Sequence, residues 1–183
     1  AGRKRIAYTK KAREFIQQNK GIFKEFLQAQ KLLSVGKNIR IGKTLVTCFG
    51  GNYHAFYYIV ERGGKKLFVK LESGTSSFGQ ALNPLAQIKA MQKAEPILRK
   101  HGIQALQYEF GIEWGKMNFL AAEFQDFESV GELLHKNPAL FAKLNARINT
   151  AAVECESKGI LELRFWHCFY NPRNGKIIAF DLY

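Results

Sequence analysis

The fold of this chain is best predicted from its last twenty-five residues, Gly159-Ile160-Leu161-Glu162-Leu163-Arg164-Phe165-Trp166-His167-Cys168-Phe169-Tyr170-Asn171-Pro172-Arg173-Asn174-Gly175-Lys176-Ile177-Ile178-Ala179-Phe180-Asp181-Leu182-Tyr183. The segment 171–175 is rich in turn formers and ends in Asn-Gly, a dipeptide suited to positive φ. We therefore predict a hairpin of two short strands, 165–170 and 176–180. Asp181 then directly follows a buried strand, where a carboxylate can hold a metal ion or simply end the strand as a turn residue.

Composition predicts a folded protein, because 183 residues with 46% apolar content suffice for one sizeable core or for two small lobes. No apolar run approaches the length of a membrane span, and no export signal follows the N-terminus, so we expect a cytoplasmic protein. The three cysteines, Cys48, Cys155 and Cys168, are an odd number without paired spacing. They predict neither a disulfide framework nor a zinc site.

Positive charge is concentrated at the N-terminus. Residues 1–43 hold twelve Lys/Arg against Glu14 and Glu25, so ten of the thirteen net positive charges lie there. Apolar residues between Phe15 and Leu33 follow the spacing of an amphipathic helix, which Gly21 could divide in two, with lysines on the other face. This face predicts an anionic partner such as an acidic protein, with anionic lipid headgroups or nucleic acid as alternatives and nucleic acid not favoured, or else it is only a solvated surface.

The middle of the chain predicts a sheet. Residues 39–48, 54–60 and 67–71 are rich in β-branched and aromatic residues and are separated by glycine-containing turns, as in a three-stranded meander. The glycines of the first turn could let backbone N–H groups approach an anion, or could form an ordinary hairpin turn. Lys70 shares one face of its strand with Phe68, so it is either a residue that protects a sheet edge or a buried cation.

A helix is predicted from Asn83-Pro84 to His101-Gly102, with Glu95 on its apolar face. Because an acid on an apolar face invites a buried cation, we predict that Glu95 pairs with Lys70. A second hairpin, 106–113 with 117–124, follows. A connector at 123–127 then leads to a short helix at 130–135 and to a long helix that begins at Pro138 and ends at Lys158-Gly159.

From residue 38 onward this order of elements resembles the protein-kinase-like fold. The resemblance implies an α+β protein in which a five-stranded antiparallel N-lobe with one helix joins a reduced, mostly helical C-lobe. We expect three segments: a basic helical extension at 1–36, the N-lobe at 37–124 and the C-lobe at 125–183. The chain is similar to the minimal kinase-like domains of some bacterial effectors and toxins, which would be delivered into a target cell.

The resemblance also implies a nucleotide site. Gly50, Gly51 and Asn52 stand at the glycine-rich loop of the family, although its fuller spaced glycine triplet is missing. Lys70 matches the strand lysine that holds the α- and β-phosphates of ATP, and Glu95 is its expected helix partner. The cofactors implied are ATP and Mg²⁺.

The catalytic loop of the family matches 159–169. Glu162 stands where the family has its catalytic Asp, and Arg164 matches a basic residue that accompanies the γ-phosphate. His167 replaces the metal-binding Asn, and Asp181 matches the metal-binding Asp. We expect His167 and Asp181 to converge on one metal or phosphate position.

Three functions follow from these observations. The first is an ATP-dependent phosphotransferase that transfers the γ-phosphoryl group to a hydroxyl acceptor, possibly on a protein. The second is a pseudokinase that uses the basic helices as a binding module, which the altered catalytic positions favour. The third is a basic RNA-cleaving toxin domain with His54, His101 or His167 as acid and base, although the positive charge lies away from these histidines.

Overall fold

The structure is a computed structural model, and it describes residues 9–51, 54–73, 83–114, 117–124 and 126–182. The chain is α+β, as predicted, and it divides into two compact units. Residues 1–85 and 108–125 form the first unit, and residues 86–107 and 126–183 form the second. Among the described helices, none is both long enough and apolar enough to span a membrane.

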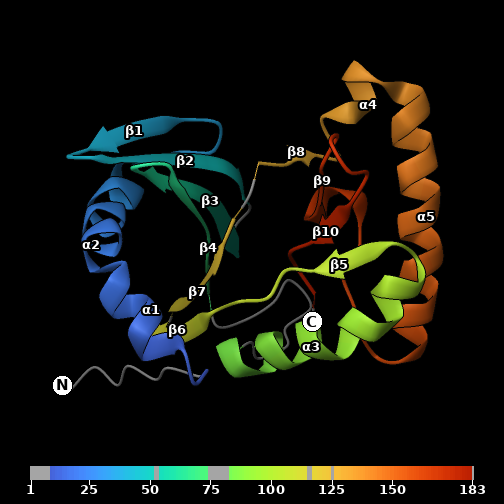
Figure 1. The fold of residues 1–183 in the computed structure, drawn as a ribbon, viewed down its shortest axis with the longest axis horizontal. Helices are drawn as coiled ribbons and strands as arrows, with labels where there is room; N and C mark the ends of the chain where they lie inside the picture. Colours follow the sequence, from blue (N-terminus) through green and yellow to red (C-terminus); the bar gives the residue numbers. More distant parts are fainter. Residues whose placement is uncertain (1–8, 52–53, 74–82, 115–116, 125, 183) are drawn as a thin grey trace. The chain divides into compact units, whose positions relative to one another are not determined.

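A six-stranded antiparallel sheet in the order β1-β2-β3-β4-β7-β6 is the centre of the first unit (Figure 1). The prediction of five strands was wrong, because the segment predicted as one strand, 39–48, folds back at a two-residue turn. Gly42 in this turn has a φ of 56°, a left-handed conformation that glycine adopts without steric cost. The strands are β1 Asn38–Ile41, β2 Thr44–Gly51, β3 Ala55–Arg62, β4 Lys65–Ser73, β6 Phe110–Trp114 and β7 Met117–Glu123.

The N-terminal helices α1 (Ala12–Gln18) and α2 (Lys20–Ala29) pack against one face of this sheet, and the 3₁₀ turn η1 (Gln30–Leu32) follows them. The predicted apolar stripe is buried in this core. The Phe26 ring is fully buried, with its centroid 5.0 Å from that of Tyr58 and 5.7 Å from that of Phe119. The two helices are divided at Asn19, not at Gly21, because the Asn19 side chain donates to the Phe15 carbonyl at the end of α1.

The second unit holds helix α3 (Pro84–Lys100), apart from its first two residues, and a four-stranded sheet in the order β5-β10-β9-β8. Its strands are β5 Ile103–Ala105, β8 Glu128–Ser129, β9 Cys168–Tyr170 and β10 Ile177–Ala179. The predicted C-terminal hairpin is confirmed as β9 and β10, which pair antiparallel, while residues 165–167 form a 3₁₀ turn, η2. The parallel pairing of β5 with β10 was not predicted, because it joins segments far apart in the sequence.

Helices α4 (Leu133–Lys136) and α5 (Pro138–Ser157) complete the second unit. Helix α5 begins and ends as the sequence predicts: the Asn137 side chain accepts a hydrogen bond from the Leu140 N–H, and Gly159 follows the last turn with a φ of 73°. The Ile160 N–H donates to the Cys155 carbonyl, which closes the helix end. The chain therefore leaves α5 in a fixed direction and enters the segment that carries Glu162 and His167.

Candidate functional site

Lys70 lies on the sheet face opposite α1 and α2, because Val69 and Leu71 beside it in β4 belong to the core under those helices. The Lys70 side chain is fully buried, and its Nζ lies 2.8 Å from Oε2 of Glu72, which is also fully buried. Glu72 is two residues further along the same strand and on the same face. The structure therefore gives Lys70 a partner within its own strand, Glu72, and the pairing with Glu95 stays a prediction.

Glu95 makes local contacts in the second unit. One of its carboxylate oxygens accepts a hydrogen bond from the Ala105 N–H at 2.6 Å, and the other lies 2.7 Å from Nε of Arg99, one helical turn away. These contacts join α3 to β5 and account for an acid on the inner side of the helix. Strand alternation in the sequence predicts the contact between Lys70 and Glu72, since residues 68, 70 and 72 share one face of a strand.

An aromatic cluster surrounds Phe68 in the first unit. Phe68 is fully buried, and four other rings, drawn from four segments of this unit, have centroids 5.9 to 6.5 Å from its own. They belong to Phe49, Tyr57, Tyr108 and Phe124. Phe68, Tyr57 and Lys70 share this sheet face, so the ion pair and the aromatic cluster lie side by side on it. Sequence reasoning missed the cluster because its rings come together only in the folded sheet.

The predicted phosphate loop forms the end of β2. Gly50 and Gly51 pair with Tyr57 and Phe56 of β3 after a bulge at Cys48, and Asn52 lies outside the described residues. A Cβ at Gly51 would lie 2.9 Å from the Ala55 carbonyl oxygen, so this position requires glycine. Gly51 thus has a structural reason to be glycine, whereas a Cβ at Gly50 would meet only the Tyr57 ring, at 3.4 Å.

Asp181 and His167 come together in the second unit, as predicted. Nε2 of His167 lies 3.5 Å from Oδ2 of Asp181, and the Asp181 side chain is almost completely buried. The Phe180 N–H donates to the His167 carbonyl, so the backbone of the hairpin holds the two residues side by side. Nδ1 of His167 lies 2.8 Å from the Glu162 carbonyl oxygen. A carbonyl only accepts, so Nδ1 carries a hydrogen and Nε2 is the nitrogen that faces the carboxylate.

Glu162 has a φ of 74°, and among the described non-glycine residues it alone has a positive φ. A side chain in the left-handed region costs about 1–2 kcal/mol. The Glu162 carbonyl in this strained turn accepts from His167. Strain of this kind often marks functional loops, and here it falls on the residue predicted as the catalytic acid or base.

Arg164 is held at the end of α5. Its Nη1 lies 3.0 Å from a carboxylate oxygen of Glu156 and donates to the Leu163 carbonyl at 2.8 Å. The ion pair is partly exposed, so it contributes little to stability and can be exchanged for another anion.

The donor atoms fit a magnesium ion only in part. In the part of the chain that the structure describes, no group of three or more His, Cys, Asp or Glu side chains could hold a metal. Mg²⁺ prefers oxygen ligands and is often bound by one or two carboxylates together with substrate phosphates. Asp181 suits this mode, whereas a ring nitrogen such as that of His167 does not. A magnesium ion carried by a nucleotide fits these residues, and a site built from protein ligands alone does not.

His101 and the three cysteines take no part in the contact between His167 and Asp181. His101 contacts Glu154 through Nε2 at 2.8 Å, whereas His167 contacts Glu162 and Asp181. All three cysteines are free and buried, and burial raises the pKa of the Cys155 thiol to about 11. These thiols are therefore unsuited to act as nucleophiles at neutral pH.

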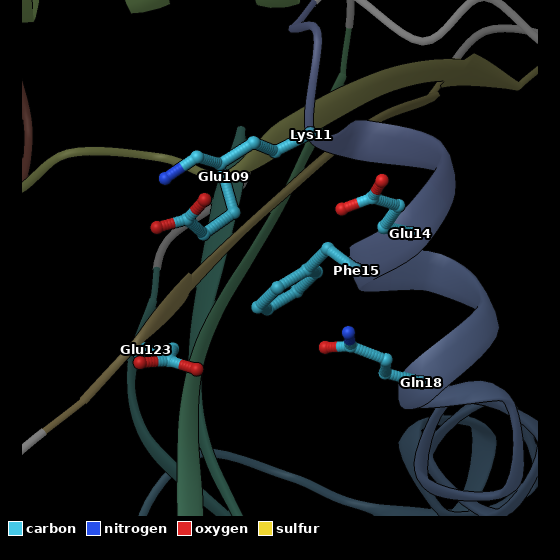
Figure 2. A pocket seen from close by; sticks show the side chains of 6 residues that line it. All are labelled: Lys11, Glu14, Phe15, Gln18, Glu109 and Glu123. Carbon is cyan, nitrogen blue, oxygen red and sulfur yellow. The ribbon is translucent and has the colours of Figure 1, made fainter.

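A pocket of about 290 Å³ opens elsewhere in the first unit, and none of the predicted site residues lines it. Figure 2 shows the Phe15 ring pointing from α1 toward the side of the pocket that carries Glu109 and Glu123. Glu14 and Gln18 lie on the helix side of the pocket, and Lys11 extends from the start of α1 toward Glu109. Three carboxylates against one ammonium group would repel phosphates, so this pocket does not suit a nucleotide.

No protein-family model matches this chain, and no curated protein matches it in sequence. Among solved structures, it is similar to the kinase domain of PknI from Mycobacterium tuberculosis, with 12% identity and a TM-score of 0.43 over 81% of this chain and 62% of that one. A double mutant of the same domain gives 14% identity and a TM-score of 0.44 over 81% and 63%. The chain thus spans less than two thirds of these kinase domains, and the likeness assigns no role to any residue.

Proposed function

We propose that this chain is an ATP-dependent phosphotransferase of minimal kinase-like fold. The observation that carries the proposal is the buried ion pair of Lys70 and Glu72. Burying two charges costs several kcal/mol per ion, and such pairs often contribute nothing to stability relative to apolar residues. A pair of this kind on a strand, beside aromatic rings, is better explained by a need for a fixed cation. A charged lysine held in place by its own strand suits the phosphates of a nucleotide.

The second unit supplies the remaining groups of the proposal. Asp181 would hold a magnesium ion together with phosphate oxygens, and His167 would orient the Asp181 carboxylate through its contacts with Glu162 and Asp181. Bound Mg²⁺ would neutralise charge on the transferred phosphoryl group. His167 thus acts in this proposal as a positioning residue, and the role of metal ligand falls to Asp181.

The reaction would pass the γ-phosphoryl group to a hydroxyl. The bond between the γ-phosphorus and the β–γ bridging oxygen breaks, a bond from the acceptor oxygen to the γ-phosphorus forms, and the acceptor proton passes to the Glu162 carboxylate. Arg164, released from Glu156, would offset charge on the γ-phosphoryl group. The backbone N–H groups of Gly50 and Gly51, with Asn52, would cover the phosphates.

The proposal is tested with ATP labelled at the γ-phosphate, in the presence of Mg²⁺. We expect the labelled phosphoryl group to be transferred to water or to the chain itself. We expect Asp181→Asn to lose most of this transfer activity. Glu156→Gln is the matched control for a removed surface carboxylate and should retain activity, since it only frees Arg164. Equal release by the wild type and by Asp181→Asn would contradict the proposal.

A second candidate, a pseudokinase that binds without turnover, is favoured by one observation. The Lys70 ammonium group, which would have to bind the phosphates, already has the Glu72 carboxylate as its counter-charge. In that case ATP would stabilise the chain equally with and without Mg²⁺, no labelled phosphate would be released, and the N-terminal helices would recruit an acidic protein or another anionic partner.

A further inference from the structure

The N-terminal helices and the β1–β2 turn carry many exposed cations. Five exposed lysines lie on α2, η1 and the segment that follows them: Lys20, Lys24, Lys31, Lys37 and Lys43. We call these five residues the basic face. The acid within the same stretch, Glu25, is already engaged, because its carboxylate accepts a hydrogen bond from the Thr44 hydroxyl and lies 3.7 Å from Nη1 of Arg62. The basic face therefore keeps its positive charge.

Two exposed aliphatic side chains lie in the sequence between lysines of the basic face. Leu32 is 69% exposed and Val35 is 46% exposed, although Leu33 between them packs against the core of the first unit. Lys31 and Lys37 flank these two residues in the sequence. The turn after α2 thus presents two apolar side chains to solvent with ammonium groups on both sides.

We propose that the basic face binds the surface of an anionic lipid membrane, with Leu32 and Val35 entering the headgroup region. Binding to a membrane surface is strengthened both by apolar area buried in it and by attraction to anionic lipids, and here a cluster of basic residues is combined with exposed apolar side chains. All five cations are lysines, which are flexible point charges suited to diffuse phosphates rather than to one fixed acceptor. This inference is independent of the proposed phosphotransfer, because none of its residues belongs to that site.

The apolar side chains favour lipid over the other anionic partners. Single-stranded nucleic acid is bound through exposed aromatic rings on which bases stack, and the exposed apolar residues of this turn are aliphatic. Protein interfaces usually depend on aromatic or arginine side chains in well-packed pockets, and leucine and valine are under-represented among their energetic centres. Leucine and valine beside lysines match the composition of surfaces that lie on membranes.

The test is sedimentation of the full chain with vesicles of phosphatidylcholine alone and of phosphatidylcholine mixed with phosphatidylserine. We expect binding only to the mixed vesicles, weakening as salt is raised. Each basic residue near an anionic membrane is worth about 1 kcal/mol, or about fivefold in partitioning. The triple variant Lys24→Glu, Lys31→Glu, Lys37→Glu should therefore lose about a hundredfold or more. Its control reverses three exposed lysines of the second unit, Lys89, Lys143 and Lys176, and changes the net charge equally.

A second pair of variants tests the apolar contribution. Leu32→Ser with Val35→Ser should weaken vesicle binding about tenfold, whereas Leu134→Ser with Val153→Ser, at exposed positions of α4 and α5, should not. Because all four side chains are exposed, we expect both double variants to keep the melting temperature of the wild type. An unchanged melting temperature verifies that the variants are folded. Equal loss in the lysine control would overturn the proposal. The proposal would also be overturned if the chain bound single-stranded RNA or polyglutamate more tightly than vesicles at the same salt, and if Leu32→Ser with Val35→Ser left that binding unchanged.

Discussion

Nζ of Lys70 lies 2.8 Å from Oε2 of Glu72, and both side chains are fully buried on one face of β4. The two charges belong to the same strand, two residues apart, so the pair forms as soon as the strand is extended and covered. This arrangement gives the sheet a fixed ammonium group with a counter-charge in its own strand.

The first prediction concerns the coupling between these two residues. Lys70→Met should destabilise the chain by about 3–5 kcal/mol, because it removes the positive charge that lies 2.8 Å from the buried Glu72 carboxylate. The double variant Lys70→Met, Glu72→Leu should recover most of this loss, since both charges are then gone. Urea unfolding of the two variants measures the difference. A double variant as unstable as the single one would show that the substitutions of Lys70 and Glu72 are not energetically coupled.

The second prediction concerns the packing of α2 on the sheet. Phe26→Ala should reduce the free energy of unfolding by about 3–5 kcal/mol, because the ring is fully buried between Tyr58 and Phe119. Gln28→Ala, at an exposed position of the same helix, should change it by no more than about 0.5 kcal/mol. If both substitutions had the same small effect, α2 would not be an integral part of the first unit.

The third prediction separates the backbone of Glu162 from its carboxylate. With a φ of 74°, this position should accept Glu162→Gly without loss of stability, whereas Glu162→Val should be less stable than the glycine variant by about 1–2 kcal/mol. Thermal unfolding of the two variants gives the comparison. A valine variant as stable as the glycine variant would show that the left-handed conformation is not kept.

The fourth prediction concerns acid sensitivity. Hydrogen bonds from Lys100 and His101 hold the pKa of Glu154 below its ordinary value of 4.5. A lowered pKa in the folded state means that the stabilisation is present above the pKa of the unfolded state and is lost as the pH falls through the folded-state pKa. The melting temperature of Glu154→Gln should therefore lie below that of the wild type at neutral pH and approach it below about pH 4. Parallel curves for the two proteins would contradict this.

Local signals in the sequence predicted much of the fold. Pro138 and Gly159 mark the ends of α5, the Asn174-Gly175 turn marks the C-terminal hairpin, and the three-and-four spacing from Phe15 onward marks the buried face of α1 and α2. These features depend on neighbouring residues, and the structure confirms them.

Features that depend on distant residues were not predicted. The aromatic cluster around Phe68 and the pairing of β5 with β10 join segments far apart in the chain. The contact of Lys70 with Glu72 was not predicted, although strand alternation places both residues on one face of β4. The convergence of His167 and Asp181 was predicted correctly, because it follows from the hairpin between them.

The most direct test of the central claim is a thermal-shift titration of the full chain with ATP, with and without Mg²⁺. At a concentration a hundredfold above the dissociation constant, binding adds about 2.7 kcal/mol, which corresponds to about 5–10 °C for a chain of this size. We predict this shift with Mg²⁺ and a smaller one in EDTA, with the difference lost in Asp181→Asn and both shifts lost in Lys70→Met, Glu72→Leu. A melting temperature that millimolar ATP with Mg²⁺ leaves unchanged in the wild type would contradict the account.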